Sequence, residues 1–214
     1  MILASRPLWL AQTNCYVLAA ESGGPAVLID APPEPDALTE MVREHNVIPA
    51  ALFLSHGHID HMGGAGPFNR STGATVYVHR DDDFLTLDPG RQLRSLFGMA
   101  PAGDYQPPEK LESLEHQLMI NIGGLEIQVR HTPGHTPGHC CFYLPQEGVL
   151  FSGDQLFAGS VGRVDLPGGN WDQLVESMIK EVLTLDDQIR VLPGHGPETT
   201  IGRERRRNPF LAGL

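Results

Sequence analysis

The stretch Leu54-Ser55-His56-Gly57-His58-Ile59-Asp60-His61 decides the fold expected of this chain. It continues the apolar run at 51–54, which predicts a buried strand. On a strand, His56 and His58 would point the same way, and a turn at Gly57 can bring Asp60 and His61 round toward the same space. Imidazole nitrogens and a carboxylate oxygen suit zinc, iron or manganese. Four ligands so close together are more than one ion usually takes from one loop, which indicates two ions side by side.

The pattern of an apolar strand, a short turn and a metal-ligand side chain returns three times along the chain. The apolar runs lie at 127–130, 148–151 and 189–192, and the side chains that follow them are His135, Asp154 and His195. Strand ends deliver their loops to one edge of a core, so these loops would assemble a polynuclear metal site at that edge. The joint pattern is far more specific than any of its motifs alone.

The order of elements favours a layered α/β arrangement. A strand at 27–30, a helix at 36–45 with apolar residues at helical spacing, and the strand before His56 give a β-α-β opening. A second amphipathic helix is expected at 172–183. Between about 80 and 116 the pattern weakens and prolines gather, which indicates an insertion that could serve as a lid or could be a plain surface excursion.

Composition limits the class of protein. The length of 214 residues, with 41% hydrophobic and 19% charged residues, fits a single domain over 1–214 with a sizeable core. The net charge of -11 argues against a nucleic-acid partner, and no apolar run is long enough to span a membrane. No signal peptide is visible, and Cys15, Cys140 and Cys141 cannot all pair, so we expect reduced thiols and a cytoplasmic location.

With these residues in view, the chain resembles the metallo-β-lactamase superfamily, and within it the short, single-domain glyoxalase II-like (hydroxyacylglutathione hydrolase-like) hydrolases. The resemblance covers nearly the whole chain. It rests on the ligand motifs quoted above, on the segment 162–169 (Gly-Arg-Val-Asp-Leu-Pro-Gly-Gly) and on the tail 206–211 (Arg-Arg-Asn-Pro-Phe-Leu).

The resemblance implies a four-layer αββα sandwich with the site at one edge of two packed sheets. It implies two divalent metal ions per chain, with zinc expected and iron or manganese as alternatives. The implied ligands are His56, His58 and His135 for one ion, Asp60, His61 and His195 for the other, and Asp154 as the bridge.

The expected chemistry is hydrolysis of an S-acyl thioester, such as S-lactoylglutathione, by a metal-bound hydroxide. Two ions that share a water lower its pKa, and one of them can stabilise the oxyanion. Asp60 is the catalytic residue expected to orient the hydroxide or move its proton. Arg163 could bind a substrate carboxylate, with a structural pair to Asp165 as the alternative. Asp30, Ser55 and His139 are expected near the ligands, with Asp30 and Ser55 orienting imidazoles and a plain turn role left open for Asp30.

Two other activities stay open. A persulfide dioxygenase on a similar frame binds one iron through two His and an Asp, and it also resembles this chain around 162–165. A lactonase shares all seven ligands. The chain stops where the C-terminal domain of glyoxalase II would begin, so another thiol carrier than glutathione is an alternative. The oligomeric state is unknown from the sequence.

Overall fold

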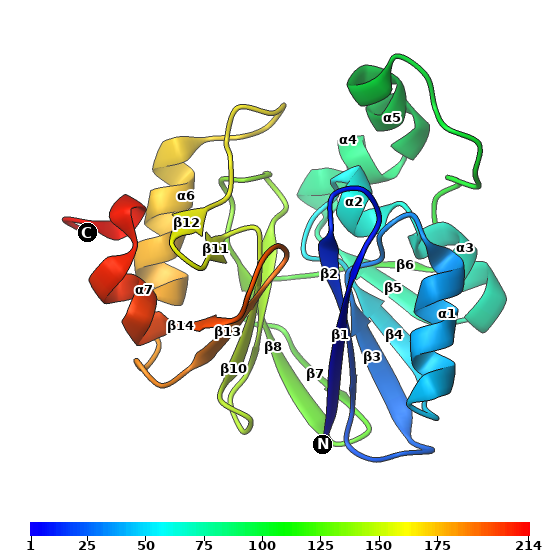
Figure 1. The fold of residues 1–214 in the computed structure, drawn as a ribbon, viewed down its shortest axis with the longest axis horizontal. Coiled ribbons are helices and arrows are strands. Elements are labelled where there is room, and N and C mark those ends of the chain that lie inside the picture. Colours follow the sequence, from blue (N-terminus) through cyan, green and yellow to red (C-terminus); the bar gives the residue numbers. More distant parts are fainter.

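A computed structural model describes the whole chain, Met1–Leu214, and contains two six-stranded sheets packed face to face (Figure 1). The first sheet has its strands in chain order: β1 (Ile2–Leu8), β2 (Thr13–Ala19), β3 (Pro25–Ile29), β4 (Ile48–Phe53), β5 (Thr75–Val78) and β6 (Leu111–Ser113). Strands β1 to β3 are antiparallel, whereas β3 to β6 run parallel. The edge strand β6 comes from the segment 80–116.

The second sheet is built from the C-terminal half of the chain. Its order is β14 (Thr199–Thr200), β13 (Arg190–Pro193), β10 (Val149–Gly153), β9 (Cys140–Leu144), β8 (Leu125–His131) and β7 (Met119–Ile122). Only the β10–β13 pair is parallel. A small hairpin of β11 (Leu156–Phe157) and β12 (Ser160–Val161) follows β10.

Helices cover the outer face of each sheet, which confirms the αββα sandwich. Against the outer face of the first sheet lie α1 (Pro35–Glu44) and α3 (Ala65–Thr72), whereas α2 (Ile59–Met62), α4 (Asp83–Thr86) and α5 (Pro89–Phe97) lie above the end of this sheet in Figure 1. The short η1 (Arg80–Asp82) leads from β5 into α4. On the second lie α6 (Trp171–Ser177), the π-helical η2 (Met178–Val182), α7 (Ile201–Arg207) and η3 (Pro209–Leu211). No helix is both long enough and apolar enough to cross a bilayer.

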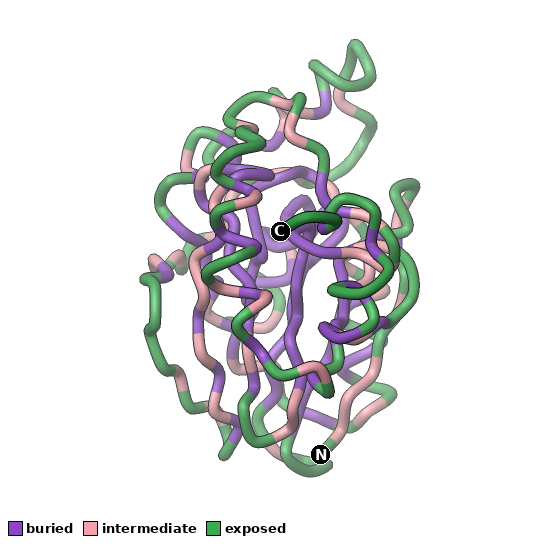
Figure 2. The backbone as a smooth tube through the Cα atoms, turned by 90° about the vertical axis from the view of Figure 1, so that its left-hand side faces the viewer, coloured by how far each residue is buried: buried purple, intermediate pink, exposed green.

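Three apolar layers hold the sheets and helices together, and buried backbone runs along the strands (Figure 2). Strand β2 shows how one strand serves two layers, because successive side chains point to opposite faces. Tyr16 and Leu18 pack between the sheets, whereas Cys15 and Val17 face the helices. Strands covered on both faces read as continuous apolar runs, which is why the sequence marks them so clearly.

The adjacent cysteines follow the same rule. Cys140 lies in the layer between the sheets and Cys141 faces α6. Both, like Cys15, are buried and unpaired. Burial raises the pKa of Cys141 to about 12, because a thiolate loses its hydration in an apolar layer. The thiols are therefore core residues.

Candidate metal centre

The structure brings together all seven side chains that the sequence singles out. They come from the ends of four strands: His56 and His58 follow β4, Asp60 and His61 start α2, His135 lies between β8 and β9, Asp154 follows β10 and His195 follows β13. Three groups of His and Asp in this set have ligand atoms within 4.8 Å of one another. The Gly194 backbone lies so close to His61 that a Cβ atom added at Gly194 would stand 2.7 Å from the imidazole ring.

The first group is a triangle of three imidazoles. His58 Nδ1 lies 2.9 Å from His135 Nε2, and His135 Nε2 lies 3.2 Å from His56 Nε2. All three side chains are buried. Nitrogen ligands about 2.0–2.1 Å from a tetrahedral zinc ion would stand about 3.3 Å apart. The spacing of the triangle therefore fits one metal ion at its centre.

The second group combines two imidazoles with a carboxylate. His61 Nε2 lies 3.3 Å from His195 Nε2, and Asp60 Oδ2 lies 3.4 Å from the first and 3.3 Å from the second of these nitrogens. Asp60 also accepts a hydrogen bond of 3.1 Å from Thr13 Oγ1. The spacing again fits a single ion.

Asp154 stands between the two groups. Its Oδ2 lies 3.5 Å from His135 Nε2 and 3.6 Å from His195 Nε2, while its Oδ1 lies 3.4 Å from His61 Nε2. Oδ1 is buried and has no hydrogen-bond partner. A buried carboxylate oxygen without a partner is costly, and a cation would remove that cost.

Hydrogen bonds to the outer ring nitrogens fix which imidazole nitrogen carries the proton. His135 Nδ1 donates to the backbone oxygen of Arg163 at 2.7 Å, and His195 Nδ1 donates to that of Ala11 at 3.2 Å. His61 Nδ1 faces Asp30 Oδ2 at 2.8 Å. In the neutral rings the inner Nε2 atoms then carry lone pairs. Lone pairs that face each other cannot form hydrogen bonds, so the donor set matches a divalent cation.

The charge balance differs between the two groups. Burial lowers the pKa of His58 to about 3 and that of His135 to about 4, so the first triangle is neutral and ready to bind a metal at neutral pH. Burial acts to lower the pKa of His61 as well, but Asp154, Asp60 and Asp30 raise it well above its usual value. The carboxylates thus favour positive charge around the second group.

Asp30 and Ser55 lie directly behind the ligands. Asp30 accepts hydrogen bonds from the Ser55 backbone N–H at 2.7 Å and from Ser55 Oγ at 2.9 Å, in addition to the contact with His61. Because the Ser55 hydroxyl donates its hydrogen bond to Asp30, its Oγ can accept a hydrogen bond from His56 Nδ1 at 3.0 Å. Asp30 has φ of 61°, a left-handed conformation that is uncommon outside glycine and that aims its carboxylate at the site.

His139 holds the backbone of Asp154 rather than facing either metal group. Its Nε2 accepts a hydrogen bond of 3.0 Å from the Asp154 N–H, and its Nδ1 lies 2.8 Å from Thr132 Oγ1. The side chain of Arg163 is exposed and makes a two-pronged pair with Asp165, with both distances at 2.7 Å. The internal pair considered from the sequence is therefore present.

The sequence does not single out Asp82 and Gln92, two residues of the segment 80–116. Both form hydrogen bonds with the loops that carry the candidate ligands, here called the metal loops. The buried Asp82 carboxylate accepts hydrogen bonds from Gly57 N at 2.8 Å, Gly138 N at 2.7 Å and Thr136 Oγ1 at 2.7 Å. It thereby joins the loop that carries His56 and His58 to the loop that carries His135.

Gln92 of α5 makes a second connection. Its Oε1 accepts from the Ile59 N–H at 3.0 Å, and its Nε2 donates to the Gly57 and Leu85 carbonyls at 2.8 and 3.0 Å. No local motif marks either residue. The one sequence signal near Asp82 is the acidic run 81–83, which does not tell the buried carboxylate from its neighbours.

Comparison with known proteins places the chain in a family. The profile described as "Metallo-beta-lactamase superfamily" matches residues 8–195. The chain therefore belongs to the metallo-β-lactamase superfamily, whose fold carries His and Asp clusters of this dinuclear type.

Individual relatives match this chain over nearly the full length of both proteins. The crystal structure of BLEG-1 B3 metallo-β-lactamase is similar with a TM-score of 0.89 and 37% identity, covering 99% of this chain and 100% of that one. The crystal structure of TTHA1623 in a di-iron-bound form has a TM-score of 0.85 and 40% identity with the same coverage. The Haemophilus influenzae protein named hydroxyacylglutathione hydrolase GloC is 33% identical, over 96% of this chain and 95% of its own length. The di-iron relative indicates that the metal is not fixed by the fold.

Proposed function

We propose that this protein is a dinuclear metal-dependent hydrolase that cleaves S-acyl thioesters of the S-lactoylglutathione type. The observation that carries the proposal is the pair of ligand groups on either side of Asp154, with inner imidazole nitrogens 3.2 Å apart in the first group and 3.3 Å apart in the second. His56, His58 and His135 would hold one ion, Asp60, His61 and His195 the other. Two divalent ions, zinc in the first instance, supply a lowered pKa for water and an electrophile for the carbonyl oxygen.

Asp60 is the chain's own group for handling the proton. Burial acts to raise its pKa, but His61 and His195 lower it well below the usual value, so Asp60 is ionised at neutral pH. Thr13 occupies one position on Oδ2, and the side chain lines the open pocket. We propose that Asp60 accepts a hydrogen bond from the attacking water and sets its direction.

No side-chain nucleophile is required by this proposal. The three cysteines are buried in the core and none lines the pocket. A thioester suits a site without a strong general acid, because a thiolate leaves without prior protonation. The similarity to a protein named hydroxyacylglutathione hydrolase supports a thioester as the first substrate to test. Unpaired cysteines also support the cytoplasmic location expected from the sequence.

We also propose that the helical part of the segment 80–116, α4 and α5, forms the cover of the site, whereas β6 extends the first sheet. In support, Phe84 and Leu85 of α4 and Leu96 and Phe97 of α5 line the pocket above the ligands. Because Asp82 and Gln92 are bonded to the metal loops, we propose a wall that stays in place rather than a lid that swings.

The test is hydrolysis of S-lactoylglutathione by freshly purified protein, followed by loss of the thioester absorbance and release of thiol. We expect turnover that disappears after chelation and returns with added zinc, iron or manganese. Oxygen uptake with glutathione persulfide, one iron per chain and no thioester hydrolysis would instead identify a persulfide dioxygenase. Turnover of lactones without turnover of any thioester would identify a lactonase.

A further inference from the structure

A pocket of about 800 Å³ opens directly onto the two ligand groups. Its floor includes five of the seven proposed ligands, namely His58, Asp60, His135, Asp154 and His195. A pocket of this size exceeds what a two- or three-carbon acyl group would fill. Small-molecule sites commonly have volumes of about 300–1,000 Å³ and bury most of the ligand.

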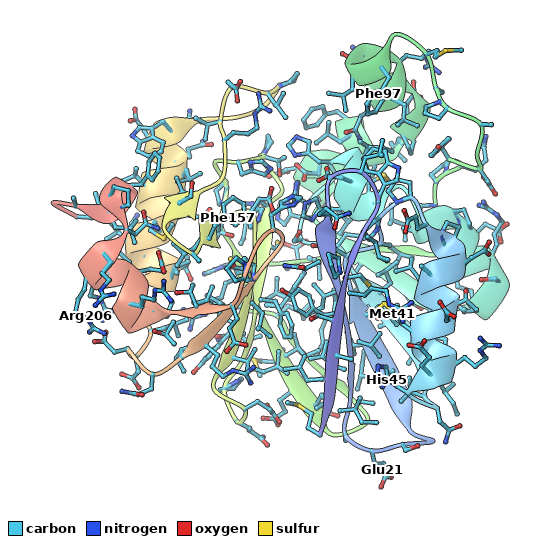
Figure 3. All side chains as sticks on the ribbon, in the orientation of Figure 1. Glu21, Met41, His45, Phe97, Phe157 and Arg206 are labelled. Atoms are coloured by element: carbon cyan, nitrogen blue, oxygen red, sulfur yellow. The ribbon has the colours of Figure 1, made fainter.

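Three separate segments give the pocket apolar walls. The turn between β1 and β2 supplies Trp9 and Leu10, α5 supplies Leu96 and Phe97, and β11 supplies Phe157. Figure 3 labels Phe97 and Phe157, which come from opposite sides of the site. The Trp9 and Phe97 rings meet edge to face with centroids 6.1 Å apart.

Three of these apolar side chains are exposed to solvent, and Trp9 and Phe157 are half-buried. Leu10 is 78% exposed, Leu96 55% and Phe97 48%. Exposed apolar residues that stand singly need no explanation, but a group of them around one pocket marks a binding surface. Because the group is continuous with the proposed catalytic floor, its occupant is a part of the substrate.

The charges of the pocket lining also favour an apolar occupant. Arg91 and Arg163 are its only cationic side chains, and Arg163 is already paired with Asp165. Asp88 also lines the pocket. The tripeptide glutathione brings two carboxylates, for which this lining offers one unpaired arginine. An uncharged apolar group therefore fits the walls better than an anionic one.

We infer that this pocket selects thioesters with a large apolar group next to the scissile carbonyl, either a medium-length acyl chain or an apolar thiol. This inference rests on the proposed thioester hydrolysis and narrows its substrate class: S-lactoylglutathione, with a small polar acyl group and an anionic thiol, should be turned over less well than an apolar thioester. Two substrate series separate the two sources. The first joins acyl groups from acetyl to decanoyl to the neutral thiol N-acetylcysteamine, and the second joins an acetyl group to thiols of growing apolar size.

The expected result is a rise of kcat/KM with chain length in one of the two series. A fully buried methylene gives about fourfold, and we expect about twofold to fourfold for each one in this open pocket. Phe97→Ser should reduce the ratio of long-chain to acetyl activity. Leu87→Ser is the matched control, because Leu87 is an exposed residue of the same segment, just after α4, and does not line the pocket. It should keep the ratio of the unsubstituted protein.

A binding measurement keeps the inference testable apart from catalysis. S-alkyl thioethers of N-acetylcysteamine cannot be hydrolysed, and Trp9 fluorescence, isolated by Trp171→Phe, reports their binding. From methyl to octyl we expect Kd to fall at least about tenfold. Tighter binding without hydrolysis of any thioester would support the pocket and overturn the proposed function. Hydrolysis without chain-length dependence, or with the same dependence in Phe97→Ser, would overturn this inference and leave the proposed function standing.

Discussion

The hydrogen bonds of Asp82 make a prediction about how the metal loops are held. In Asp82→Ala the Gly57 and Gly138 backbone N–H groups lose their acceptor in a buried site. The Thr136 hydroxyl loses its acceptor too, but it can rotate about its C–O bond, which a backbone N–H group cannot do, so only the two backbone donors are counted. Each orphaned buried donor costs about 1–3 kcal/mol. The variant should therefore lose about 2–6 kcal/mol of unfolding free energy, a large share of the roughly 5–15 kcal/mol typical of a domain.

Asp82→Asn should cause a smaller loss of unfolding free energy than Asp82→Ala. The amide keeps one acceptor oxygen but turns an NH2 group toward one of the donors, so we expect a loss of about 1–3 kcal/mol. The control is Asp81→Asn, since the Asp81 side chain is exposed and accepts none of these bonds. It should stay within about 0.5 kcal/mol of the unsubstituted protein.

The assay is urea unfolding of metal-free protein, followed by tryptophan fluorescence and circular dichroism, so that metal loss does not enter the result. A second reading is the chelator concentration that removes half of the metal, which should fall in Asp82→Ala because the loops are no longer joined. Unfolding of Asp82→Ala at the same urea concentration as Asp81→Asn would contradict this role of Asp82.

Four further predictions concern the site and the core. Asp154→Ala should abolish hydrolysis and reduce bound metal with circular dichroism unchanged, and retained activity would contradict the bridging role. Arg163→Ala should change KM equally for an acidic and a neutral acyl thioester, because its guanidinium is already paired with Asp165, and a larger rise for the acidic one would show that Arg163 binds substrate. Chelation should lower Tm and added metal should restore it, because an ion that binds only the folded state stabilises that state. Burial raises the pKa of Cys141 from 9.0 to about 12, so the native thiol should resist thiol reagents at pH 8. The same shift makes the free energy of unfolding depend on pH, because the unfolded thiol ionises first. The contribution of Cys141 to stability is complete below pH 9 and should be lost as the pH rises toward 12. A Cys141→Ala variant with the same alkaline loss of stability would contradict that assignment.

The convergence of the seven candidate ligands could be predicted from the sequence because each lies a few residues beyond a predicted strand. His56 and Asp154 follow strands buried on both faces, which leave a clear signal, and the parallel ends of those strands meet at one edge. The sequence alone does not decide whether Asp30 orients an imidazole, since a strand-end aspartate is also an ordinary turn residue. Its left-handed backbone and three short contacts were needed to see the arrangement.

The sequence indicates that residues 80–116 could cover the site, but it does not identify Asp82, Gln92 or the individual residues of the pocket walls. The bonds of Asp82 join residues 25 and 56 positions apart, so no local spacing encodes them. The apolar walls come from segments around Trp9, Phe97 and Phe157, and each segment alone looks like an ordinary surface turn or short helix. Only the packing of the two sheets brings these segments to the same side of the metal groups.

The proposed hydrolase function requires two metal ions that act together in one chain. The most direct test titrates metal-free protein with zinc and follows thioester hydrolysis and bound metal in the same samples. We expect the rate to rise until about two equivalents are bound per chain and then to stay level. A rate that is complete at one equivalent, with the second ion bound weakly or not at all, would contradict this requirement.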